Sequence, residues 1–157
     1  VNHCSTVSHL LLQQEFNLDI THCLIIKKRM PKNYPKGWRE MKKVGETVEG
    51  TNFVPCKAPI RGDWSLWTLM ARRPDVKFII DMAGTEYYSP RDCERSGITH
   101  RKIFMQPDRG NVPAESHVQE FLQAVGEAEA VLEEGEMIAV HCTRGLNRTG
   151  YMICRRE

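Results

Sequence analysis

The chain lacks any apolar run that approaches the ~20 residues needed to cross a bilayer. Leu10–Leu12 forms a short apolar run near the start, but Gln13, Gln14 and Glu15 follow at once. Because a secretory signal contains a longer unbroken apolar stretch, we expect that this run is not one. We therefore expect a protein that does not contact a membrane.

An excess of charge of one sign is also lacking. The 22 basic and 20 acidic side chains leave a formal net charge of +2. Such a balance does not indicate a general nucleic-acid-binding protein, so any contact with RNA must come from a local cluster of cations. The candidates for this cluster are Lys57, Arg109, Arg144 and Arg148.

The cysteines lack the paired spacing of a metal site. Six are present, at positions 4, 23, 56, 93, 142 and 154, and none forms a Cys-x-x-Cys pair. Zinc sites usually contain such pairs, so we expect no bound metal.

The most informative stretch that is present is His141–Gly150, which has the sequence His-Cys-Thr-Arg-Gly-Leu-Asn-Arg-Thr-Gly. Met137–Val140 predicts a buried strand and Arg148–Cys154 the start of a helix, so a loop joins them. Unpaired backbone N–H groups and the helix dipole favour anions at such a helix start. There the pKa of a cysteine can fall to ~3.5–7.5, which predicts that Cys142 is a thiolate nucleophile at neutral pH.

The other residues of this loop suit a phosphate group. Arg148 can hold two phosphate oxygens with its planar guanidinium, and Gly145 permits the tight turn that points N–H groups inward. Thr149 can donate its hydroxyl to the cysteine sulfur, and Asn147 can brace the loop. Gly150 is expected to relieve crowding where the helix packs on the sheet.

A second His-Cys-x5-Arg pattern, His22–Arg29, shows that the spacing alone is weak evidence. It contains no glycine, so its apolar run cannot wrap a phosphate in backbone donors, and we interpret Cys23 as a coincidence. The glycines and the strand-loop-helix setting of the other motif also argue against the alternative that Cys142 is an ordinary buried thiol.

The His141–Gly150 stretch resembles the signature of cysteine-dependent phosphatases. Its form Cys-Thr-x-Gly-x-Asn-Arg-Thr-Gly-Tyr is similar to one branch of them. That branch contains the RNA/RNP-complex-interacting phosphatases, which are atypical dual-specificity phosphatases, and the RNA 5′-triphosphatase domain of metazoan mRNA capping enzymes. Three weaker stretches, Trp38–Pro59, Ile79–Tyr88 and Lys102–Phe104, extend the likeness over residues 31–155.

This resemblance implies an α/β fold of the protein-tyrosine-phosphatase type, with a central, mostly parallel sheet flanked by helices. It also implies that Cys142 and Arg148 are catalytic and that His141 and Thr149 support them. The phosphate-binding residues it implies are Thr143, Arg144, Gly145, Leu146, Asn147 and Arg148.

The role of Asp108 is left open. Protein phosphatases of this class carry a general-acid aspartate on a loop before the cysteine, and Pro107–Gly110 lies in about that place. Asp108 is therefore either that catalytic acid or a solvated loop carboxylate. A triphosphatase could work without an acid, because a di- or triphosphate leaving group is already a stable anion.

We predict two regions in the chain. Residues 1–30 match nothing in the family and are expected to form an atypical, poorly ordered extension. Residues 31–157 are expected to form the phosphatase domain. Several helices follow the signature loop in the family, whereas this chain ends at Glu157, so we expect a truncated domain without its C-terminal helices.

Alternating strands and helices within the domain independently predict an α/β fold. We expect an edge strand at Phe53–Val54 closed by Pro55, and further strands at Val76–Met82 and Lys102–Met105. A short helix is expected after Asp63, with Trp64, Leu66, Trp67 and Met70 available for burial. A second helix from Pro113 carries the apolar stripe Val118, Phe121, Leu122, Val125, Ala128 and Leu132.

The function we expect is an RNA 5′-polyphosphatase that needs no metal or cofactor and acts on tri- or diphosphate RNA 5′ ends. The resemblance also implies a contact with ribonucleoprotein complexes and a nuclear rather than cytoplasmic location. One alternative is a protein dual-specificity phosphatase acting on tyrosine, serine or threonine. Another is an inactive, truncated fragment that binds phosphate or RNA.

Overall fold

The computed structural model describes residues 34–62, 64–106 and 112–156. The chain divides into two compact units, Val1–Lys32 and Asn33–Glu157, and the described residues all lie in the second unit. The predicted extension 1–30 and the second Cys-x5-Arg pattern at Cys23 lie outside the described residues. Within the described part of the chain, no helix is long and apolar enough to cross a membrane.

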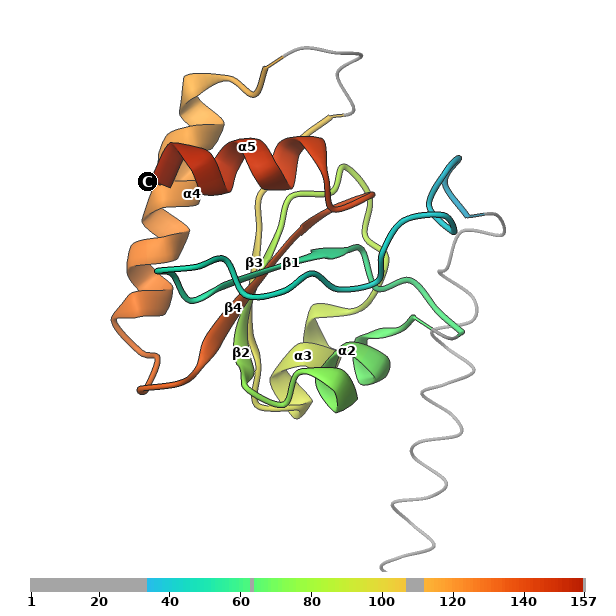
Figure 1. Ribbon diagram of the computed structural model, residues 1–157, viewed down its shortest axis with the longest axis horizontal. Helices are drawn as coiled ribbons and strands as arrows, with labels where there is room; N and C mark the ends of the chain where they lie inside the picture. Colours follow the sequence, from blue (N-terminus) through green and yellow to red (C-terminus); the bar gives the residue numbers. More distant parts are fainter. Residues whose placement is uncertain (1–33, 63, 107–111, 157) are drawn as a thin grey trace, which may run out of the picture. The chain divides into compact units, whose positions relative to one another are not determined.

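A four-stranded sheet forms the centre of the second unit (Figure 1). Its strands are β1 (Phe53–Lys57), β2 (Val76–Asp81), β3 (Thr99–Lys102) and β4 (Met137–Cys142), in the spatial order β1-β4-β2-β3. Every pairing among them is parallel, so the predicted α/β fold with a parallel sheet is confirmed. Parallel strands point their carboxyl ends to one edge, which places the ends of β2 and β4 side by side.

Helices cover both faces of this sheet. They are α2 (Leu66–Arg72), α3 (Pro90–Arg95), α4 (Glu115–Glu129) and α5 (Asn147–Arg156). In Figure 1, α4 and α5 lie on one side of the strands and α2 and α3 on the other. Along β4, Ile138, Val140 and Cys142 belong to the apolar cluster formed with α4 and α5. Ala139 and His141 alternate onto the opposite face, as strand geometry requires.

The predicted amphipathic helix is confirmed. Helix α4 begins at Glu115, two residues after Pro113, and Glu115 occupies its first turn, where a negative charge complements the dipole. Of the predicted stripe, Leu122 and Leu132 are only partly buried, while Ala124, which was not predicted, is fully buried.

The strand predicted at Lys102–Met105 is misplaced, because β3 spans Thr99–Lys102. Ile103 and Met105 look like strand residues in the sequence, but they are buried in the apolar cluster after the strand has ended. β3 lies at the edge of the sheet, where its side chains are exposed or only partly buried, so it shows no apolar pattern.

Strand β1 lies at the other edge, as predicted, but it continues through Pro55 to Lys57. An edge strand tolerates proline because a missing backbone donor can face away from the sheet.

Helix α2 differs from its prediction in two ways. Its N-cap is Ser65, whose side chain accepts a hydrogen bond from the Thr68 backbone N–H, and the predicted cap Asp63 lies outside the described residues. Trp67 was expected to be buried but is 59% exposed, because Leu66 and Leu69 fill the inward face of this helix. The short helix α3 was not predicted, although Pro90 in its first turn and Gly97 just after its end are typical helix boundaries.

Candidate active site

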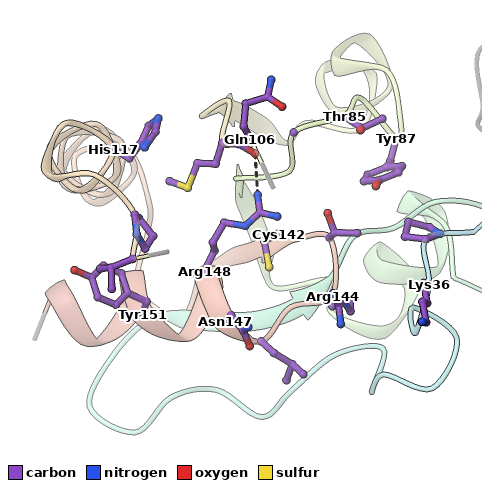
Figure 2. A pocket seen from close by; sticks show the side chains of 17 residues that line it. Lys36, Thr85, Tyr87, Gln106, His117, Cys142, Arg144, Asn147, Arg148 and Tyr151 are labelled. Atoms are coloured by element: carbon purple, nitrogen blue, oxygen red, sulfur yellow. Dashed lines mark hydrogen bonds between the residues drawn. The ribbon is translucent and has the colours of Figure 1, made fainter. Parts of the chain in front are cut away.

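The loop that joins β4 to α5 lies at the carboxyl edge of the sheet and forms the floor of a pocket. Cys142 is the last residue of β4 and is 4% exposed, and Asn147 begins α5. The pocket has a volume of about 650 Å³. Figure 2 shows Cys142 and Arg148 at its centre, with His117 and Tyr151 on one side and Lys36 and Arg144 on the other.

Gly145 is the glycine that this loop requires. Its φ of +74° lies in the left-handed region, and a Cβ there would overlap the backbone carbonyl of Cys56 in the neighbouring strand β1. The loop therefore packs directly on the strand that lies beside β4. The interpretation of Gly150 was wrong, because a Cβ at that position meets no atom within 4 Å.

Arg148 is held by the ends of two other chain segments. Its Nη1 donates hydrogen bonds of 2.9 Å to the carbonyl oxygen of Met82, after β2, and of 2.9 Å to that of Met105, after β3. These two bonds use both hydrogens of Nη1 and fix the plane of the guanidinium. Nε and Nη2 then form a two-donor edge of the kind that binds two oxygens of one phosphate.

The environment of Cys142 favours its thiolate. Burial opposes the charge, but the Thr149 hydroxyl, the backbone N–H groups of Thr149 and Gly145, and the positive charge of Arg148 together bring the pKa of Cys142 below its ordinary value. Thr149 is fully buried, and its Oγ1 has no well-aligned hydrogen-bond partner in the described part of the chain. A thiolate supplies the acceptor that this hydroxyl otherwise lacks.

His141 lies behind the cysteine and is fully buried. Its Nδ1 is 3.1 Å from the carbonyl oxygen of Cys142, which can only accept, so Nδ1 carries the proton. The Tyr88 hydroxyl, 2.6 Å from Nε2, is then the donor to that nitrogen. Burial lowers the pKa of His141, although Asp81 opposes this effect, so the ring is neutral at neutral pH.

Asp81 is a buried carboxylate at the end of β2, 3.7 Å from Nδ1 of His141. Lys102 donates to its Oδ2 at 2.9 Å and the backbone N–H of Ala83 donates to its Oδ1 at 2.9 Å. Burial disfavours the charge of Asp81, but His141, His100, Lys102 and the Ala83 N–H outweigh this and hold its pKa well below the usual range. Asp81 is thus a buried negative charge close to His141, while the Cys142 carbonyl and the Tyr88 hydroxyl orient the imidazole ring.

The remaining predicted loop residues gather at the pocket. Thr143, Arg144, Leu146 and Asn147 all line it, and Leu146 is 56% exposed. The predicted general acid Asp108 and the predicted cation Arg109 lie outside the described residues.

Lys57 does not belong to an exposed cationic cluster, so this part of the prediction was wrong. It is 2% exposed, and its Nζ donates a 2.9 Å hydrogen bond to the carbonyl oxygen of Trp38. The side chain is buried because β1 directs it beneath the Trp38 ring, 3.8 Å from the ring centroid.

Several pocket residues were not identified from the sequence. Lys36, Tyr87, Gln106, His117 and Tyr151 line the pocket but come from five separate parts of the chain. Asp81 could have been identified from the sequence, because it ends a buried strand. Burying a carboxylate there costs free energy unless a nearby cation or hydrogen-bond donor compensates its charge. Among residues 34–62, 64–106 and 112–156, no group of three or more His, Cys, Asp or Glu side chains could hold a metal ion.

A cysteine between a parallel strand and a helix, with an arginine fixed beside it, defines the class of protein-tyrosine-phosphatase-like enzymes. The family described as "Polymorphic toxin system, DSP-PTPase phosphatase" matches residues 68–155. The chain therefore belongs to the cysteine-dependent family of dual-specificity and tyrosine phosphatases.

The relatives similar in sequence are named either as tyrosine-protein phosphatases or as RNA/RNP complex-1-interacting phosphatases. A tyrosine-protein phosphatase of Autographa californica nuclear polyhedrosis virus is 32% identical over 78% of this chain and 78% of the viral protein. The Caenorhabditis elegans homolog of RNA/RNP complex-1-interacting phosphatase is 33% identical over 82% of this chain, and the human RNA/RNP complex-1-interacting phosphatase is 30% identical over 82%. The matched part spans 63% of the nematode protein and 43% of the human one.

Solved structures agree with the fold. The Siw14 catalytic core has a TM-score of 0.53 at 19% identity, covering 78% of this chain and 67% of the other. PTPMT1 in complex with PI(5)P has a TM-score of 0.53 at 15% identity, covering 67% of this chain and 66% of the other. At these identities the likeness concerns the fold alone.

Proposed function

We propose that this chain is an RNA 5′-polyphosphatase, which removes the terminal phosphate from tri- or diphosphate RNA 5′ ends through a phosphocysteine intermediate. The observation that carries the proposal is the lining of the pocket. Among the described residues that line it, Lys36, Arg144 and Arg148 are cations and none is a carboxylate. Such a pocket suits a substrate with several negative charges.

In this proposal the thiolate of Cys142 attacks the terminal phosphorus, and the S–P bond forms as the P–O bond to the remaining diphosphate breaks. The departing oxygen keeps the electron pair and leaves as a stabilised anion. Arg148 and the loop N–H groups bind the non-bridging oxygens while charge develops on them. Water then attacks the phosphocysteine, releasing inorganic phosphate and a proton and restoring the thiolate.

The pocket volume supports a substrate larger than one phosphate. About 650 Å³ lies within the 300–1,000 Å³ common for pockets that enclose a whole small molecule. The relatives named RNA/RNP complex-1-interacting phosphatase are consistent with an RNA 5′ end as the substrate and with ribonucleoprotein complexes as partners.

The second candidate is a protein phosphatase that acts on phosphotyrosine. The name of the viral relative, a tyrosine-protein phosphatase matched over 78% of its length, favours it. This reaction has a phenoxide leaving group and therefore needs a general acid, for which Asp108 is the candidate.

The deciding experiment measures phosphate release from a triphosphate-ended RNA and from a phosphotyrosine peptide, each with the wild-type chain and with Asp108→Asn. The RNA reaction should be the faster one, and the substitution should lower it by less than about tenfold, because its leaving group needs no acid. A loss on RNA within the ~10²–10⁴-fold range of general acid catalysis would contradict the acid-independent mechanism. Faster turnover of the peptide, with a large loss in Asp108→Asn, would establish the second candidate.

A further inference from the structure

A stack of aromatic and cationic side chains lies beside the pocket, and all of its members except Arg61 come from the segment that precedes β1. Tyr34 stacks on Trp38, with ring centroids 4.8 Å apart and planes inclined by 16°. The guanidinium carbons of Arg39 and Arg61 lie 4.5 Å and 5.1 Å from the centroid of the Tyr34 ring. Two guanidiniums are thus held on one tyrosine by attraction to its π-system.

The base of this stack is rigid. Trp38 is 2% exposed, and its Nε1 donates a 3.0 Å hydrogen bond to the carbonyl oxygen of Ala58. Its own carbonyl accepts from Lys57, whose side chain lies against the same ring. Tyr34 and its two arginines therefore rest on a buried residue rather than on a loose loop.

The same segment is continuous with the pocket. Pro35 and Lys36 line the pocket, and Lys36 lies on the same side of Cys142 as Arg144 (Figure 2). Gly37 turns the chain with a φ of +73°, and a Cβ built on it would contact Arg144 at 3.9 Å. A cationic path therefore leads from the phosphate loop at Arg144, past Lys36, to Arg39.

These cations are not neutralised by the described part of the protein. All three are exposed, and none forms an ion pair with a described acidic residue: Lys36, Arg39 and Arg144. Bringing like charges together costs free energy unless an anion binds between them. The Tyr34–Trp38 stack holds Arg39 at the surface, where it can contact such an anion.

We propose that Lys36, Arg39 and Arg144, with Tyr34 as the positioning residue of Arg39, bind the backbone phosphates of the nucleotides that follow the RNA 5′ end. Grooves for single-stranded nucleic acid combine cations along the backbone with aromatic platforms in this way. The inference rests on the proposed function, because it assigns the rest of the RNA chain to this path while the terminal phosphate occupies the loop. It predicts a preference for oligonucleotides over a nucleoside triphosphate.

The first experiment compares kcat/KM on a nucleoside triphosphate and on a triphosphate-ended pentanucleotide, with the whole chain. Arg39→Ala should lower the ratio of the pentanucleotide value to the nucleoside value by about twofold to fivefold, as expected for one exposed ion pair. Tyr34→Leu should lower it similarly because the ring that orients Arg39 is lost, whereas Tyr34→Phe should retain it. Arg95→Ala is the matched control, since this exposed arginine ends α3 at the opposite, amino-terminal edge of the sheet.

The second experiment measures binding of a fluorescent 5′-hydroxyl RNA decamer to the wild-type chain over a range of salt concentrations. This ligand has backbone phosphates but no terminal phosphate for Cys142 to attack, so its binding reports the path independently of catalysis. In Arg39→Ala the slope of log affinity against log salt should be smaller by about 0.7, the contribution of one single-strand phosphate contact. Arg95→Ala should keep the wild-type slope.

The outcomes separate the two proposals. If the wild-type chain hydrolyses no triphosphate-ended RNA but Arg39→Ala still reduces the salt slope, the proposed function fails and the RNA path stands. If it hydrolyses both triphosphates with equal kcat/KM, and Arg39→Ala and Arg95→Ala bind the decamer alike, the path is refuted and the proposed function stands. A loss in Arg39→Ala confined to the phosphotyrosine peptide would assign the arginines to an acidic peptide and overturn the RNA path.

Discussion

The clearest test of the site is the substitution of the buried hydroxyl beside the cysteine, Thr149→Val. This change replaces one hydroxyl by a methyl group of similar volume at a position that is 0% exposed. It removes a donor to the Cys142 thiolate and leaves the backbone N–H groups and Arg148 in place. A hydrogen bond to a charged group contributes about 1.5–3 kcal/mol, and 1.36 kcal/mol corresponds to one pKa unit, so the pKa of Cys142 should rise by about 1 to 2.

The direction of the pH effect follows from the thiol chemistry. The thiolate fraction increases as the pH rises through the pKa of Cys142, so a higher pKa moves the acid limb of reactivity to higher pH. Below the wild-type midpoint, alkylation by iodoacetamide should slow by about 10- to 100-fold. The assay is the pH dependence of alkylation at Cys142, followed by mass spectrometry of the peptide that contains it. Thr149→Ser is the control, because it keeps the hydroxyl and should keep the midpoint.

The same substitution should stabilise the fold. The Oγ1 of Thr149 is buried without a well-aligned partner in the described residues, and a protonated Cys142 offers it no charged acceptor. Burying a hydroxyl without a partner costs about 1–3 kcal/mol, so Thr149→Val should increase the free energy of unfolding by about 1 kcal/mol at a pH where Cys142 is protonated. An unchanged alkylation midpoint, or a less stable protein, would refute the role assigned to this hydroxyl.

Three further predictions concern the loop. Arg148→Lys keeps one charge but cannot bind both carbonyls and a phosphate edge, so kcat/KM should fall by about 10²–10³-fold, measured on triphosphate-ended RNA; a change below tenfold would contradict the two-donor geometry. Gly145→Ala should destabilise the protein by at least about 2 kcal/mol in urea unfolding, because it combines a left-handed backbone with overlap on Cys56. Gly150→Ala is its control and should be neutral or stabilising by up to about 1 kcal/mol, since the added methyl meets open space in a helix. Cys142→Ser should abolish turnover but keep phosphate-ended ligands bound, while Cys23→Ser should change neither; the reverse result would show that the glycines do not distinguish the two motifs.

The part of this protein that could be predicted from sequence is the part encoded by neighbouring residues. The loop from His141 to Gly150 is contiguous, so its cysteine, its arginine and the need for Gly145 follow from local spacing. The apolar stripe of α4 and the buried strands β2 and β4 follow from side-chain periodicity, which depends on one element at a time.

The tertiary structure decided what comes from separate segments. The carbonyls that fix Arg148 lie 66 and 43 residues away in the chain, and the Tyr88 hydroxyl that contacts His141 is 53 residues away. No local pattern marks these partners, because a parallel sheet brings the ends of β2, β3 and β4 to one edge whatever the intervening sequence. The burial of Lys57 and the position of Gly37 close to Arg144 have the same origin, since both depend on how the segment before β1 folds.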